Sequence, residues 1–328
     1  MRFLAPTLEW EAIAPNLMGN FSDMLIAVIS HPAMLLYLNN AKSIGPNSII
    51  GKKRSKRGLN ENLAREVLEL HTLGVDSGYS QQDIIELAKA ISGWSIVRHT
   101  KEAEYSKDNA FIFRANTHEP GSRIILNKQY PADAKGPGQG KMILTDLANS
   151  PATALHVCTK LARHFVSDIP EPRLIKQMTN VWQETQGNLK AVMSALIKSE
   201  FAWQTEAQKY KSPREFMISS YRAIGRKIPN GKTLVNHLQQ LGQTPYQASS
   251  PAGFGDLRST WDGSDALFNR IEWSAHISKK IRNVDVINLA KSALGENIKD
   301  HTLVILKRSE NQQQAISLLF MSPDFLQR

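Results

Sequence analysis

Six side chains that could hold charge or transfer protons stand out in the sequence, and five of them lie within eleven residues. Positions 60–73 read NENLAREVLELHTL, with three glutamates, one arginine and one histidine. Carboxylates and imidazoles are the usual general acids and bases, and an arginine between carboxylates forms charge-assisted hydrogen bonds with them. The candidates for a polar groove are therefore Glu61, Arg65, Glu66, Glu69, His71 and, farther along the chain, His118.

One amphipathic helix must position the first five of these residues. At about 100° per residue, Glu61, Arg65 and Glu69 fall on one polar arc, and leucines share the opposite half with Val67. His71 falls within that apolar half. The pattern predicts a helix over 60–73 that packs centrally, with its imidazole among core side chains and its charges on the other edge.

Two interpretations of this helix remain open. In the first, the acid–arginine ladder consists of i,i+4 pairs on an exposed face, and His71 is a core histidine that donates to a carbonyl. In the second, a neighbouring element covers the ionic edge, and covered ionic clusters often form functional sites. A metal ion is not favoured, because Arg65 competes for the charge of Glu66 and Glu69.

His118 lies in a polar loop, THEPGSR, between two short β-prone runs at 111–113 and 123–126. Pro120 before Gly121 suits the central positions of a type II turn. We therefore expect these two runs to pair as a β-hairpin inserted between helices, with the hairpin approaching the His71 end of the helix. An exposed turn histidine is the simpler interpretation of His118.

Helix signals dominate the rest of the chain. Two capping boxes are expected, one from Ser212 to Glu215 before a helix that stops at Gly225, and one from Ser80 to Asp83. A third helix is expected to open at Ser150-Pro151. The sequence thus predicts a mainly α, multi-helix globular protein with one small inserted β-hairpin. Further helices are expected near 21–29, 32–39, 140–148, 172–185, 188–198, 231–241, 264–280, 284–294 and 310–320.

The domain organisation is indicated by length and by one irregular stretch. A chain of 328 residues corresponds to about two domains or one large one. Positions 131–140 are rich in glycine and proline and give the best interior boundary. We expect a helical region over 1–130 with the central helix and hairpin, and a second over 141–328, either separate or forming one continuous domain.

Several functional classes are disfavoured by composition and motifs. No run of 18 apolar residues occurs, so a membrane-spanning helix is not expected, and the amino terminus shows no signal peptide. The single cysteine, Cys158, excludes a disulfide framework and multi-thiolate metal sites. Neither a GxxxxGK[ST] loop nor a GxGxxG fingerprint occurs, and we expect no metal and no cofactor.

The formal charge of +10 is not strongly organised along the chain, and the one dense basic cluster is the GKKRSKRG loop. Such a run could contact phosphates, but no aromatic residue is interleaved to stack on bases and no recognised nucleic-acid motif surrounds it. Nucleic-acid binding is therefore not favoured. The cluster consists of Lys52, Lys53, Arg54, Lys56 and Arg57.

The chain resembles a bacterial family, domain-of-unknown-function family 1800. The residues that carry the resemblance follow one another in order over nearly the whole chain: HPAMLLYLNN from His31, NENLAREVLELHTLGVDSGYSQQDI from Asn60, SGW from Ser92, THEPGSR, SPATALHVCTKLARHFVSDIP from Ser150, and SPDFLQR at the end. Family members usually run longer, with an export signal and an upstream FW-x-x-HF-type element that this sequence does not show. The resemblance thus predicts a chain that begins inside the family domain.

The resemblance also carries expectations about setting and partners. It implies a periplasmic or extracellular location and a sulfatase-like partner from domain-of-unknown-function family 1501, and it implies no particular reaction. The leading hypothesis is a binding or accessory module of an exported bacterial system, in which Arg65 pairs with carboxylates while His71 and His118 hydrogen-bond a ligand or partner. The alternative is a hydrolase acting on envelope polymers or glycans, with Glu66 or Glu69 as general base and His118 as acid.

Overall fold

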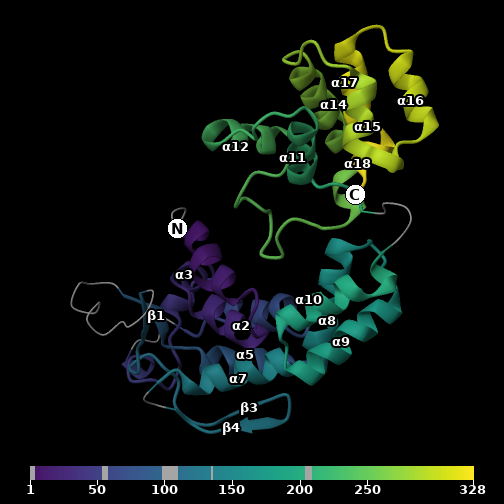
Figure 1. Cartoon of the computed structure of the whole chain (residues 1–328). Helices are drawn as coiled ribbons and strands as arrows, with labels where there is room; N and C mark the ends of the chain where they lie inside the picture. The colour runs from purple at the N-terminus through teal and green to yellow at the C-terminus, as the bar shows by residue number, and fades with distance from the viewer. Residues whose placement is uncertain (1–3, 54–57, 98–109, 134–135, 204–208) are drawn as a thin grey trace. The chain divides into compact units, whose positions relative to one another are not determined.

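The structure is a computed structural model, and it describes residues 4–53, 58–97, 110–133, 136–203 and 209–328 (Figure 1). The fold is mainly helical with little β structure, which confirms the predicted fold class. The chain divides into two compact units: unit 1 comprises Met1–Lys160 and Glu171–Glu200, and unit 2 comprises Leu161–Pro170 and Phe201–Arg328. Positions 131–140 lie inside unit 1, and 134–135 are outside the described residues.

Unit 1 is built around the helix that the sequence placed at its centre. This helix consists of α4 (Asn62–Glu66) followed by a π-helical turn, η5 (Val67–His71), and its apolar half is buried in the core. Helix α2 (Phe21–Ser30) packs against α7 (Gly138–Asn149) within the same core, and elsewhere in unit 1 α9 (Pro172–Thr185) packs against α10 (Leu189–Lys198). The remaining helices of the unit are α1 (Ala5–Leu8), α2 (Phe21–Ser30), α3 (Pro32–Tyr37), α5 (Gln81–Ala90), α7 (Gly138–Asn149), α9 (Pro172–Thr185), α10 (Leu189–Lys198) and most of α8 (Pro151–Phe165).

Two small antiparallel sheets replace the single hairpin that the sequence indicated. Strand β2 (Phe111–Phe113) pairs with β1 (Trp94–Ile96), whereas β3 (Arg123–Ile125) pairs with β4 (Lys128–Tyr130). The predicted pairing of 111–113 with 123–126 is therefore wrong.

Two local causes explain the observed pairing. The buried Trp94 ring meets the Phe111 ring edge-on at 5.5 Å, so β2 packs beside β1. The β3–β4 turn is formed by Leu126 and Asn127, both with left-handed backbone (φ 50° and 62°), which is the conformation of a type I′ hairpin. Because the turn residues are Leu126 and Asn127, the sequence lacks the Asn-Gly pair that usually indicates such a turn.

Helix starts follow the predicted capping chemistry. Ser80 accepts a hydrogen bond from the amide of Asp83, and the Asp83 carboxylate accepts one from the Ser80 amide at 2.7 Å. At α11 (Pro213–Ala223), the Ser212 amide likewise donates to Glu215 at 2.9 Å. Both predicted capping boxes are confirmed.

Unit 2 has its own core of large aromatic side chains. Helix α14 packs against α17, and Phe216, Trp273 and Phe320 are fully buried. The sequence pattern did not indicate α16, because its N-cap, Lys299, supplies no side-chain cap hydrogen bond. The helices besides α11 are α12 (Gly231–Gln240), α13 (Arg258–Trp261), α14 (Ser264–Ser278), α15 (Val286–Leu294), α16 (Asp300–Lys307), α17 (Gln312–Met321) and α18 (Pro323–Leu326).

Among the described residues, none of the helices is both long enough and apolar enough to cross a bilayer.

Candidate ligand-binding cavity

The predicted acid–arginine ladder forms on the outer face of α4 and η5. The Arg65 guanidinium lies 3.7 Å from Glu61 and 3.3 Å from Glu69, and their side chains are 40%, 35% and 25% exposed. Gln81 of α5 joins the ladder by accepting from Arg65 and donating to Glu61, at 2.9 and 2.8 Å. The edge is thus partly covered, and ion pairs this exposed contribute little to stability.

Glu66 lies one turn from Glu69 on this edge. Burial and the negative charge of Glu69 raise the pKa of Glu66, while Arg65 acts in the opposite direction. Burial and a hydrogen bond to Glu69 raise the pKa of Tyr79. These groups form a local carboxylate cluster, and among the described residues no hydrogen bond links it to a histidine.

His71 lies in the apolar half of the helix, as the helical wheel predicted. Its Nδ1 atom is buried without a hydrogen-bond partner, and burial, together with Lys160 and His156 of α8, lowers the pKa of His71 to about 4. His156 also bonds the Leu70 carbonyl through Nε2 at 3.2 Å. The imidazole of His71 is therefore neutral at pH 7 and belongs to the packed end of the helix.

His118 is buried, with 4% of its surface exposed, although the sequence allowed an exposed turn histidine. Its Nδ1 atom lies 2.8 Å from the Ser92 carbonyl oxygen, so Nδ1 carries the proton and donates. Burial is the main cause that lowers the pKa of His118. In the described parts of the chain, no hydrogen bond or ion pair joins His118 to Glu66, Glu69 or His71.

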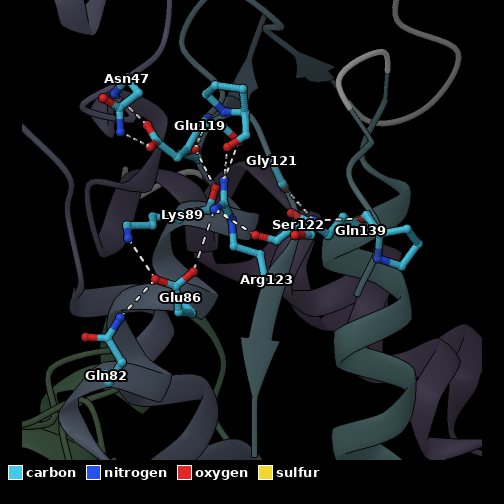
Figure 2. Close-up of polar contacts among 12 residues, drawn as sticks. Asn47, Gln82, Glu86, Lys89, Glu119, Gly121, Ser122, Arg123 and Gln139 are labelled. Carbon is cyan, nitrogen blue, oxygen red and sulfur yellow. Dashed lines mark hydrogen bonds and ion pairs between the residues drawn. The ribbon is translucent and has the colours of Figure 1, made fainter. Parts of the chain in front are cut away.

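The carboxylate of Glu119, next to His118, is buried and accepts hydrogen bonds through both of its oxygens. Glu119 is 3% exposed, and it accepts from the Asn47 backbone amide and from Asn47 Nδ2, each at 2.7 Å (Figure 2). Its own amide donates to Ser92 Oγ at 2.8 Å. Gly45 leaves the space for this carboxylate, because a Cβ there would lie 2.6 Å from Glu119 Cα, Cβ and Oε2.

Arg123 closes the loop that contains His118 and Glu119 (Figure 2). Its Nη2 atom donates to the carbonyl oxygens of Glu119 and Pro120, both at 2.7 Å, and Nη1 lies 3.7 Å from Glu86 Oε2. Glu86 is held in turn by Lys89 at 2.7 Å. We call these residues the Glu119 network: Asn47, Glu86, Ser92, Glu119 and Arg123. Glu119 and Arg123 belong to the THEPGSR loop noted in the sequence, but no sequence signal indicated Asn47 as a partner of Glu119.

A cavity of about 1080 Å³ opens beside this network. Its lining comes from several segments of unit 1, and Glu61 is the one predicted site residue that takes part. The lining is rich in asparagine and in aliphatic side chains, and we call it the asparagine-rich cavity. The described lining residues are Leu36, Asn39, Ala41, Lys42, Ser43, Ile44, Ile50, Gly58, Leu59, Asn60, Glu61, Asn62, Ile96, Arg114, Asn116 and Thr117.

Four polar side chains of the cavity are available to a ligand. Asn39, Lys42, Asn62 and Asn116 are exposed, and no hydrogen bond or ion pair of the described residues uses their side-chain atoms. An asparagine amide offers one acceptor and two donors, and a lysine ammonium offers three donors. The cavity can therefore bind a ligand through several hydrogen bonds without breaking internal ones.

The Glu119 network braces two walls of the asparagine-rich cavity. The Gly45 amide donates to the Thr117 carbonyl at 2.9 Å, and the Ile50 amide donates to the Asn116 carbonyl at 3.0 Å. Asn47 lies between these two links and is held by Glu119 from behind. The buried carboxylate thus fixes the position of wall segments that carry lining residues.

A second cavity, of about 640 Å³, borders the other side of the network but differs in chemistry. Its acids are already paired: Asp83 binds the Ser80 and Leu126 amides, and Glu86 binds Lys89. Among the described residues no cluster of three or more metal-ligating side chains occurs.

The basic cluster of the sequence is described only in part. Lys52 and Lys53 are exposed at the short helix η4 (Gly51–Lys53), whereas Arg54, Lys56 and Arg57 lie outside the described residues.

The fold and the cavity together define a mainly helical protein with a hydrogen-bonding cavity braced by buried charges. The model of the family described as protein of unknown function (DUF1800) matches residues 1–327, so the chain belongs to this family. The resemblance indicated by the sequence motifs is confirmed. No curated protein and no solved structure matches the chain.

Proposed function

We propose that the protein is a binding module and that the asparagine-rich cavity holds its ligand. The observation that supports this proposal is a large cavity in which three exposed amides and one ammonium group have no partner among the residues that the structure describes. Ligand sites are concave, and they combine apolar walls with a few well-placed polar groups. Of the residues proposed from the sequence to form a polar groove, Glu61 lies in the lining of this cavity.

The arrangement of acids and histidines favours binding over the hydrolase alternative. That alternative needs His118 within hydrogen-bond reach of Glu66 or Glu69, and His118 instead donates to the Ser92 carbonyl. The described lining contains one carboxylate, Glu61, which is engaged by Arg65 and Gln81. We therefore assign no catalytic residue.

The wider role that we propose is that of an accessory module in an exported bacterial system. Its support is the family resemblance, which implies a periplasmic or extracellular setting and a sulfatase-like partner of domain-of-unknown-function family 1501. Within this proposal, the asparagine-rich cavity is the surface that contacts the ligand or partner, while His71 and His118 stabilise the surrounding structure.

The proposal is tested by asking what remains bound to the protein when it is purified from its native host. We expect ligand or partner recovered with the wild type to be lost with Asn62→Leu/Asn116→Leu. These exchanges remove two carboxamides while keeping side chains of similar shape. The matched control is Asn180→Leu, on the exposed face of α9. Equal recovery with all three proteins would contradict a binding role for the cavity.

A further inference from the structure

The chemistry of the lining narrows the class of ligand. Resting on the function proposed above, we infer that the asparagine-rich cavity binds an extended polypeptide segment that carries aliphatic side chains and a carboxylate. Three properties of the lining support this inference: its carboxamides, its aliphatic walls and its uncompensated ammonium group.

The carboxamides match the hydrogen-bonding groups of a peptide backbone. Each peptide unit presents one donor and one acceptor, and a carboxamide can donate to the carbonyl and accept from the amide. Asn39, Asn62 and Asn116 come from three separate segments of the lining, and their side chains form no hydrogen bond with the described residues. Backbone pairing of this kind gives affinity for an extended segment, while wall contacts with its side chains give specificity.

The apolar part of the lining is aliphatic. Leu36, Ile44, Ile50, Leu59 and Ile96 contribute to it, and no aromatic side chain occurs among the described lining residues. Branched aliphatic walls suit the aliphatic side chains of a peptide. A saccharide offers flat C–H faces that pack best on aromatic rings, and the described lining provides no such platform.

The charge of the cavity favours an acidic ligand. The Lys42 ammonium is exposed, and no described residue pairs with it, whereas Glu61 is already engaged by Arg65 and Gln81. Arg114 also lies in the lining, where its Nη2 donates to the Ile96 carbonyl at 3.0 Å. A carboxylate on the bound segment would gain from the Lys42 charge, and this part of the affinity should weaken as salt rises.

The size of the cavity agrees with a segment of several residues. Its volume of about 1080 Å³ lies just above the roughly 300–1,000 Å³ typical of small-molecule sites. An extended chain advances by about 3.3 Å per residue, so successive side chains would meet different parts of the lining.

Selection from a displayed library of random decapeptides against the full chain tests the inference. We expect enriched peptides to combine aliphatic residues with at least one Asp or Glu. A selected peptide resynthesised with N-methyl groups on alternate amides should bind at least tenfold more weakly, because backbone donors are lost. Asn62→Leu/Asn116→Leu should weaken binding of the unmodified peptide at least tenfold, and Asn180→Leu should leave it within twofold.

The outcomes separate this inference from the proposed function. The peptide inference fails if the wild type enriches no peptides relative to the double variant. It also fails if the N-methylated peptide binds the wild type as tightly as the unmodified peptide does. If chitotetraose binds the wild type instead and loses binding in the double variant, the cavity function stands and the peptide inference fails. If neither probe binds the wild type, the peptide inference fails, and the recovery experiment described above decides the proposed function separately. The N-methyl comparison uses wild-type protein, so it remains decisive even if the double variant does not fold.

Discussion

Glu119 accepts hydrogen bonds from a single residue with both of its carboxylate oxygens: Oε2 from the Asn47 backbone amide and Oε1 from Asn47 Nδ2 (Figure 2). The two residues are 72 positions apart in the chain. Because Glu119 is nearly fully buried, this bidentate contact fixes the loop around Asn47 against the loop that follows His118. Lining residues of the asparagine-rich cavity stand on either side of Asn47, at Ile44 and Ile50, and just before His118, at Asn116 and Thr117, so the contact couples buried electrostatics to the candidate site.

Replacing Glu119 by glutamine should destabilise the protein. An amide can accept from Asn47 only through its oxygen, so its NH₂ group would face a second donor. Leaving a buried donor unsatisfied costs about 1–3 kcal/mol, and we expect a loss of that size in the free energy of unfolding. Urea denaturation followed by circular dichroism measures it. The same exchange at the exposed Glu184 should change little, and equal effects at both positions would contradict the assigned role of Glu119.

Gly45→Ala tests the close approach of the loop to the Glu119 carboxylate. The added Cβ would lie 2.6 Å from three atoms of Glu119, one of them backbone, so the loop must move. Overpacking of this kind typically costs about 1–3 kcal/mol, and ligand binding should weaken with it. At Gly58, on the same lining, a Cβ meets no heavy atom of the described residues within 4 Å, so Gly58→Ala is the matched control. Similar stability of both variants would count against the proposed brace.

Local patterns predicted much of the fold. Periodicity and caps depend on residues a few positions apart, which is why the helix at 60–73 and the two capping boxes followed from the sequence. The helical wheel also placed Leu63 and His71 on the buried side. These features need only short-range information.

Features that depend on distant segments could not be predicted in the same way. Strand β2 pairs with β1, which lies before it in the chain across a long connection. The turn between β3 and β4 contains Leu126 in the left-handed conformation, where leucine is atypical. The asparagine-rich cavity combines segments near 36–44, 58–62 and 114–117, none of which shows a motif for binding by itself. Only Glu61 links the predicted groove with the cavity.

Arg65 and Arg123 provide a comparison between an exposed and a buried arginine. Arg65→Met removes ion pairs at a side chain that is 40% exposed, and such pairs contribute about 0–1 kcal/mol. Arg123→Met leaves the Glu119 carbonyl, which is buried, and the Pro120 carbonyl without their donor and removes the ion pair with Glu86, and we expect a loss of about 3 kcal/mol or more. Chemical denaturation of the two variants gives the comparison directly. A larger loss for Arg65→Met would show that the exposed ladder, rather than the Glu119 network, holds this region together.

His71 should make stability depend on pH between about 6.5 and 4. Burial lowers its folded-state pKa to about 4 from an ordinary value of 6.5. As the pH falls through this window, the unfolded chain binds a proton that the folded chain does not, so acid destabilises the fold. The shift corresponds to roughly 3 kcal/mol at most, lost progressively on going from neutral pH to about pH 4.

The His71→Gln variant isolates this contribution from that of other titrating groups. Its free energy of unfolding, measured by urea denaturation at several pH values, should fall less steeply than that of the wild type between pH 6.5 and 4. The comparison uses the slope, so it holds even if the variant is less stable at every pH. Asn180→Leu, an exchange of a non-titrating side chain on the exposed face of α9, should retain the wild-type slope. An unchanged slope in His71→Gln would mean that the imidazole gains its proton while the protein remains folded, and that the end of η5 admits water.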